Sequence, residues 1–179
     1  MLDANHNLSE VMTDELGFVK ALALLGKGNE ADDLNGLNEF VSDAENDLAD
    51  DFFQTTASDM LTTHGKSLLQ HATARFAYDL NAYRHSGKPV VVASILREEH
   101  FQKNNDSPLQ LSFEYSNGLG QVVMKKSQAE PGKAKQVIVS SDNSYTITEI
   151  DTAAINPKQL RWIGNGRTEL NNKGNAVKQ

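Results

Sequence analysis

The sequence predicts a mainly β protein of hairpins and meandering strands. A short helical, acidic insert makes the class α+β if it is counted. Apolar and polar residues alternate from Leu109 to Tyr115, the period-two pattern of a strand with one buried face. Short D/N-x-x-G motifs, which are typical of turns, follow such strands. The chain is therefore divided into a hairpin (1–25), an insert (26–73) and a β-meander (74–179).

The first two regions are expected to contain one hairpin and two helices. Residues Leu8–Leu25 predict strand, turn and strand, and the Gly-, Asn- and Asp-rich residues 26–36 predict a loop. Apolar residues near helical spacing predict a short helix within Leu37–Phe53. A second helix is expected over Ser58–His64.

The ends of the second helix follow from its flanking residues. Thr56 or Ser58 could act as the N-cap, because a hydroxyl oxygen there can accept a free backbone N–H. Gly65 is expected to end the helix.

The third region should be built from short strands. The segment from Ala74 to Leu80 alternates, Ser86–Pro89 reads as a turn, and Leu109–Ser127 reads as a hairpin that residues 128–135 then interrupt. The remaining expected strands are Val90–Leu96, Gln136–Val139, Tyr145–Ile150, Leu160–Ile163 and Thr168–Leu170.

Charge is distributed unevenly along the 179 residues. There are 17 Lys and Arg against 24 Asp and Glu, so the formal net charge is −7, and there is no Cys. Ten of the acidic residues lie between Glu30 and Asp59, where no Lys or Arg occurs. Such a run is expected to be a solvated surface, and no frame within it fits a calcium-binding EF-hand. The negative charge argues against nucleic-acid binding, the absence of Cys excludes disulfides, and the longest apolar runs are too short to span a membrane.

The turn motif recurs along the chain. Asp14 and Gly17 have the same spacing as Asn117 and Gly120, and again as Asn171 and Gly174. Asn and Asp side chains bond nearby backbone N–H groups, and Gly adopts a positive φ without steric cost. A fourth copy begins at Asp3 but has His6 in place of the glycine.

Because D/N-x-x-G turns lie between short strands, the sequence resembles YD-repeat proteins of the Rhs type. More specifically, it resembles the B component of Tc-type (SpvB/TcdB-like) insecticidal toxin complexes. The segments that carry the resemblance, in order, are 26–32, 76–83, 97–100, 113–121, 125–132, 161–168 and 170–179. The sequence departs from the family at His6 and in the variable acidic region 36–65.

The resemblance implies a non-enzymatic structural role. In that family, YD repeats wind into a hollow β-shell, completed by a C component, that encloses a cytotoxic C-terminal domain; the B component also docks onto a pore-forming A component. The expected partners are therefore the rest of the same shell protein, the C-type component and the A-type subunit. The implied location is secreted or exported, although Met1–His6 lacks the features of a Sec signal peptide. This chain is expected to be a fragment of the shell wall that does not itself contact membrane.

Few residues indicate other chemistry. The five histidines, His6, His64, His71, His85 and His100, fit no metal-binding motif and are expected to be ordinary surface residues. No nucleophile elbow, P-loop or dinucleotide fingerprint occurs. We therefore expect no catalytic, cofactor or metal site.

Two alternatives remain open. Trp162 could be a stacking platform in a glycan- or protein-binding β-module, although a single Trp in a strand more often belongs to the core. A hydrolase would need paired carboxylates in one rigid cleft. Open strand edges of a shell fragment also predict that the isolated chain self-associates or is partly disordered.

Overall fold

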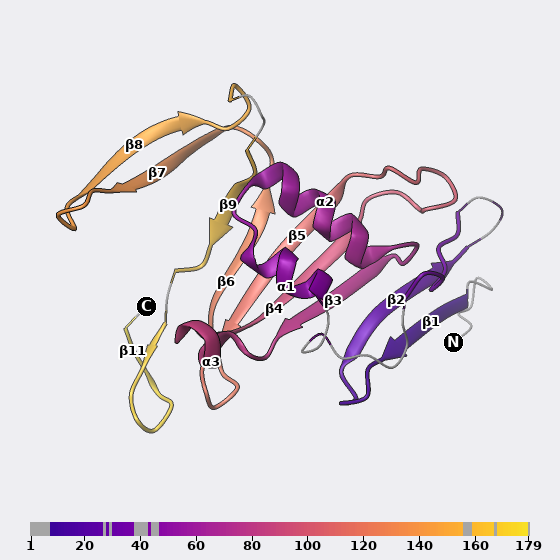
Figure 1. Ribbon diagram of the computed structural model, residues 1–179, viewed down its shortest axis with the longest axis horizontal. Helices are drawn as coiled ribbons and strands as arrows, with labels where there is room; N and C mark the ends of the chain where they lie inside the picture. Colours follow the sequence, from indigo (N-terminus) through magenta and orange to yellow (C-terminus); the bar gives the residue numbers. More distant parts are fainter. Residues whose placement is uncertain are drawn as a thin grey trace.

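A seven-stranded antiparallel sheet forms the body of the protein, and two helices cover one of its faces (Figure 1). The computed structural model describes residues 8–26, 28, 30–37, 43, 47–155, 159–166 and 168–178. The strand order is β1-β2-β3-β4-β5-β6-β9, with β7–β8 and β10–β11 as separate two-stranded hairpins. The predicted mainly β class is confirmed. The proposed fourth turn, Asp3–His6, lies outside the described residues.

The elements follow the chain with few crossovers. The strands are β1 (Leu8–Thr13), β2 (Val19–Leu25), β3 (Ala74–Asp79), β4 (Val90–Arg97), β5 (Leu109–Ser116), β6 (Val122–Ala129), β7 (Lys133–Val139), β8 (Tyr145–Asp151), β9 (Arg161–Gly164), β10 (Glu169–Leu170) and β11 (Ala176–Lys178). The helices are α1 (Asp47–Gln54), α2 (Ser58–Leu69) and α3 (Ala82–Ser86).

Alternation in β4 and β5 supplies the buried face of the sheet. The two strands pair antiparallel along their whole length, from Val90 opposite Ser116 to Arg97 opposite Leu109. Every second residue of each strand lies on this face and is apolar and buried: Val91, Ala93 and Ile95 on β4, and Leu109, Leu111 and Phe113 on β5. This face is therefore the one that must be covered.

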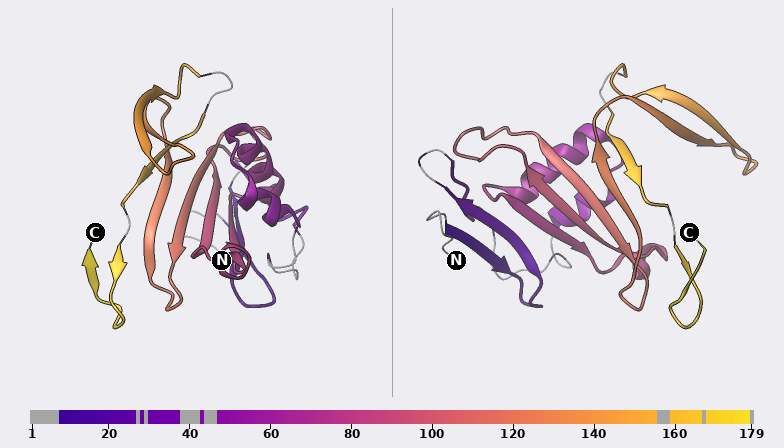
Figure 2. Two further views of the ribbon diagram at one scale, coloured as in Figure 1. Left: turned by 60° about the vertical axis from the view of Figure 1, so that its left-hand side comes forward. Right: turned by 180° about the vertical axis from the view of Figure 1, so that it is seen from behind.

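Helices α1 and α2 provide that cover, and they lie together on one side of the sheet (Figure 2). Phe52 on α1 and Leu69 on α2 are completely buried against the sheet. The Phe52 ring stacks on Phe113 of β5, with 5.8 Å between the ring centroids. The predicted insert thus holds the helical half of the core.

The ends of α2 differ from the prediction. The helix continues through Gly65 to Leu69, so Gly65 as a helix stop is wrong. A Cβ at Gly65 would meet Leu109 Cδ1 at 3.3 Å and Phe52 Cε2 at 3.6 Å, so the glycine permits the helix to approach α1 and β5 closely. The N-cap is Ala57, which makes no side-chain capping bond.

Some elements had no clear sequence signal. Helix α3 lies just ahead of the expected Ser86–Pro89 turn, where no helix was expected, and β7 begins at Lys133, inside the segment expected to interrupt the strands. Helix α1 occupies the end of the predicted Leu37–Phe53 helix; residues 38–42 and 44–46 of that segment lie outside the described residues.

The hairpin β7–β8 projects beyond the end of the main sheet (Figure 1). Val137 pairs with Ile147 and Val139 pairs with Tyr145, and all four side chains are exposed. No helix in the described part of the chain is long and apolar enough to cross a membrane.

Candidate functional site

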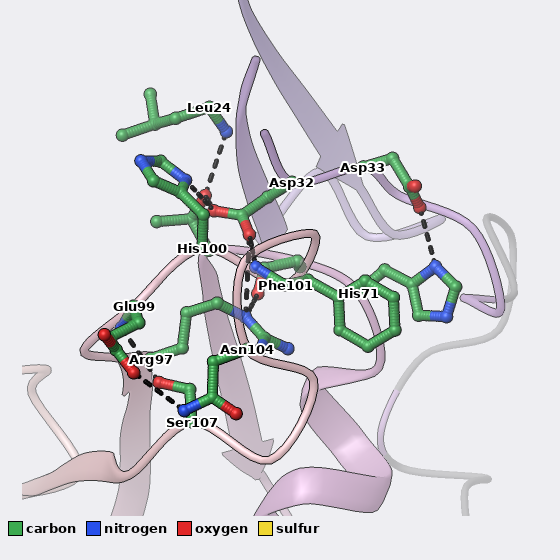
Figure 3. A network of polar contacts seen from close by, with 12 residues as sticks. Leu24, Asp32, Asp33, His71, Arg97, Glu99, His100, Phe101, Asn104 and Ser107 are labelled. Atoms are coloured by element: carbon green, nitrogen blue, oxygen red, sulfur yellow. Dashed lines mark hydrogen bonds and ion pairs between the residues drawn. The ribbon is translucent and has the colours of Figure 1, made fainter. Parts of the chain in front are cut away.

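The carboxylate of Asp32 is fully buried, and several polar groups converge on it (Figure 3). Its Oδ1 accepts the backbone N–H of Phe101 at 2.5 Å. Its Oδ2 accepts the Thr73 hydroxyl at 2.5 Å and lies 2.9 Å from Nδ1 of His100. The Arg97 guanidinium lies on the other side, with Nε 3.8 Å from Oδ1. We call these five residues the Asp32 cluster.

Arg97 links this cluster to the end of α2. Its Nε donates to the Ala72 carbonyl at 2.7 Å, and a terminal nitrogen donates to the Gln70 carbonyl at 2.5 Å. A cation beside these carbonyls also interacts favourably with the negative end of the helix dipole. Burial lowers the pKa of Arg97, and the Asp32 carboxylate opposes that shift.

A second His–Asp pair lies beside the cluster. His71 stacks on the Phe101 ring, with 3.8 Å between the ring centroids, and its Nδ1 lies 3.0 Å from Oδ1 of Asp33 (Figure 3). The Arg97 guanidinium carbon also lies 5.1 Å from the centre of the Phe101 ring. Phe101 is therefore held by both its backbone N–H and its ring.

The loop between β4 and β5 is ordered by its own polar contacts. Ser107, which is buried, accepts the Glu99 N–H at 2.8 Å, and Asn104 donates to Glu99 Oε2 at 2.7 Å. The hydrogen bond from Asn104, and after it the contact with Lys103, lowers the pKa of Glu99.

The Asp32 cluster holds distant segments of the chain together. Both oxygens of Asp32 are occupied by donors and the side chain has no exposed surface. The adjoining cavity is small, about 180 Å³, and is bounded in part by His71, Arg97 and Phe101. The cluster joins three segments far apart in the sequence: the loop after β2, the end of α2 and the loop after β4.

Asp43 is a second buried acid of the insert, and it lies where the sheet is weakest. Strands β2 and β3 pair at two positions, Ala21 with Arg75 and Leu22 with Ala74. Arg75 is buried, forms an ion pair with Asp43, and donates to the Lys20 carbonyl of β2 at 3.1 Å. Side-chain contacts therefore supplement the short ladder between these strands.

The expectation that the acidic run is solvated is wrong for Asp32 and Asp43. Each is buried because an arginine of the sheet, Arg97 or Arg75, pairs with it. A buried charge requires such a partner to offset its lost hydration. The run contains no basic residue, so nothing within it indicated where the partners would come from.

The three predicted turns adopt one geometry. At Asp14, Asn117 and Asn171, the backbone N–H donates to the carbonyl four residues later, and the glycine N–H donates back to the first residue's carbonyl. Each side-chain Oδ1 also accepts the N–H groups two and four residues on. The glycines Gly17, Gly120 and Gly174 have φ of +83°, +76° and +78°.

Another turn of this geometry, which was not predicted, joins β7 to β8. Ser140 N–H donates to the Ser144 carbonyl at 2.9 Å, Asn143 N–H donates to the Ser140 carbonyl at 3.0 Å, and Asn143 has φ of +62°. Ser replaces Asp or Asn at the first position, and Asn replaces Gly at the fourth, so the motif was missed. The sequence keeps one signal of the turn: Asn143, a residue that tolerates a positive φ, lies three positions after the small polar residue Ser140.

Trp162 lies on β9 and is partly buried. Its ring meets Phe113 edge to face, with 5.5 Å between centroids, and the Lys126 ammonium lies 4.8 Å from its centre. Trp162 therefore packs against the hydrophobic core.

The histidines are more connected than expected. His71 and His100 are partly buried and paired with Asp33 and Asp32, and His64 Nδ1 lies 3.0 Å from the Thr55 hydroxyl. His85 is exposed, and His6 lies outside the described residues. Within the described ranges, no group of three or more His, Asp or Glu side chains is arranged to hold a metal ion.

Comparison with known proteins yields a likeness in fold. No known protein-family model matches the sequence, and no curated protein matches it either. Among solved structures, the chain is similar to one chain in the crystal structure of TcdB2–TccC3, with a TM-score of 0.64 and 17% identity. The match covers 98% of this chain and 8% of that much longer one. At this identity the match shows that the chain shares its fold with part of a Tc toxin complex protein.

Proposed function

We propose that this chain is a non-catalytic wall segment of a toxin-complex shell that encloses a cytotoxic C-terminal domain. The observation that carries the proposal is the fold match to TcdB2–TccC3 over almost the whole chain. The sequence resemblance to the B component, carried by turns and strands along the chain, points in the same direction.

The arrangement of the sheet supports a wall. In the described part of the chain, the outer edges of β1 and β9 have no partner strand, and an open edge presents backbone groups ready to pair. In a shell, neighbouring strands of the same long protein would fill both edges. The proposed partners are therefore the remainder of that protein, the C-type component and the A-type pore-forming subunit, and the proposed location is outside the producing cell.

The Asp32 cluster gives such a wall segment its rigidity. Its contacts join three separate segments, and those with His100 and Phe101 hold the insert to the loop after β4. These contacts support a structural role for the acidic insert within a wall.

The proposal is tested by purifying the chain from its source organism with an affinity tag added at the native locus. Electron cryomicroscopy of the purified particle should show a hollow shell, with this seven-stranded sheet in its wall. A free particle of about the mass of this chain alone would overturn the proposal. So would specific binding on a glycan array that is lost in Trp162→Ala, because that result favours the glycan-binding alternative.

A further inference from the structure

A second, larger cavity lies on the helix-covered side of the sheet. Its volume is about 720 Å³, and its walls come from α1, the α1–α2 connection, α3 and strands β3 to β6. This volume falls in the range of roughly 300–1,000 Å³ that is usual for small-molecule sites. Exposed side chains such as Asp50 and Lys88 lie among its walls, so the cavity opens to solvent.

The floor of this cavity is apolar. Phe52, Leu61, Val91 and Phe113 line it, and each is at most 8% exposed. Phe52 and Phe113 are stacked on one another within this floor, and the partly exposed aromatic rings of the lining are those of Phe53 and Tyr115. Such a floor favours a ligand with a flat, apolar body.

Lys126 places one cation at this aromatic surface. Its Nζ lies 4.6 Å from the centre of the Phe113 ring, 5.9 Å from that of Tyr115 and 4.8 Å from that of Trp162. Among the described residues, no carboxylate forms an ion pair with it, whereas the neighbouring Lys125 pairs with Glu114. Burial lowers the pKa of Lys126, and no acidic group opposes that shift.

The other charged groups that line the cavity are of both signs. Asp50 and Asp79 are opposed by Lys88 and by His85 when protonated, and all of these except Asp79 are exposed. Lys126 is the charged group that lies against the aromatic rings, and a cationic ligand would be repelled there.

From this geometry we propose that the cavity binds a small organic anion with a flat aromatic body. The anionic group would pair with the Lys126 ammonium, and the body would lie against the partly exposed rings of Phe53 and Tyr115. The inference rests on side chains of this chain alone, so it holds or fails independently of the shell function.

Three probes of one shape and different charge test the proposal: naphthoate, naphthylmethanol and naphthylmethylamine. Each is titrated into the isotope-labelled full chain, and backbone amide shifts locate the site. Naphthoate should bind most tightly, with shifts at Phe113, Tyr115 and Lys126, and the amine most weakly. Equal affinities for the three probes, or no shifts at these residues, would overturn the proposal.

Two variants separate the contribution of the Lys126 charge to binding from that of its apolar side-chain contacts. Lys126→Met keeps the length and apolar contacts of the side chain and should weaken naphthoate roughly tenfold or more, because it removes a charge-assisted contact. It should leave naphthylmethanol unchanged. Lys125→Met, on the other face of β6, should leave both probes unchanged. Unaltered naphthoate affinity in Lys126→Met would refute the assigned role of the ammonium.

Discussion

At the scale of single residues, the charge of Asp32 is the feature on which most contacts converge. An asparagine there would keep one oxygen but would turn an N–H₂ group toward Thr73, His100 or Phe101, all of which donate to the carboxylate. It would also leave the buried Arg97 without its counter-charge. We therefore expect Asp32→Asn to lower the free energy of unfolding by about 3–5 kcal/mol, as measured by urea denaturation.

Asp33→Asn is the matched control for this prediction. Asp33 is partly exposed, and its contacts are with the His71 ring and the Asn35 N–H, which an amide oxygen can still accept. Its replacement should cost no more than about 1 kcal/mol. Equal losses in the two variants would show that burial of Asp32 does not set its importance.

The loop carboxylate Glu99 gives a prediction in pH. Asn104 is the main cause of its lowered pKa, so Asn104→Ala should raise that pKa toward its ordinary value, as followed by NMR titration of the side-chain carboxyl. Because the folded-state pKa lies below the unfolded one, the group stabilises the fold above the unfolded pKa, and this contribution is lost as the pH falls through the folded-state pKa. An unchanged Glu99 titration in Asn104→Ala would contradict the assignment.

Sequence reasoning could not foresee these residue-level contacts. Asp32 and Asp43 look the same in the sequence as their solvated neighbours, and their arginines are 32 or more positions away. Pairing across such separations is set by which loops the sheet brings together. By contrast, the Asp14, Asn117 and Asn171 turns were visible because all of their contacts are local.

At the scale of elements, the turn geometry predicts different costs for two glycines of one hairpin. Gly120 has φ of +76°, whereas Gly118 lies outside the left-handed region, and a Cβ at either position meets nothing within 4 Å. Gly120→Ala should therefore destabilise by about 1–2 kcal/mol through backbone strain alone, while Gly118→Ala should be nearly neutral. Thermal melts of both variants measure this. Equal melting temperatures would argue against strain at Gly120.

The alternation of apolar and polar residues correctly predicted the strands that face the core. It was a poor guide to elements whose ends depend on other contacts. The alternation in β4 and β5 was clear because one face of each is buried. Strand β7 was predicted too short because most of it is exposed on both faces, so little in its sequence marks where it begins. The extension of α2 through Gly65 depends on close packing against Phe52 and Leu109, which no local pattern reports.

At the scale of the whole molecule, the three sequence regions share one sheet and one core. Strand β2 of the first region pairs with β3 of the third, and the helices of the second pack on β3, β4 and β5. The sequence indicated the mainly β class and the hairpins, whose signals are local. It did not indicate which face the insert would cover, because that depends on contacts between distant segments.

The open edges of the sheet predict how the isolated chain behaves. Val11 on β1 is 57% exposed, and in the described residues the outer edge of that strand is unpaired. We expect the chain to self-associate with rising concentration in sedimentation velocity, and Val11→Lys to reduce this, because a lysine on an edge strand opposes further pairing. Leu119→Lys, an equal change at an exposed turn, should have no effect. A wild-type chain that stays monomeric at every concentration would mean that this edge is protected, and would weaken the case that it awaits neighbouring strands.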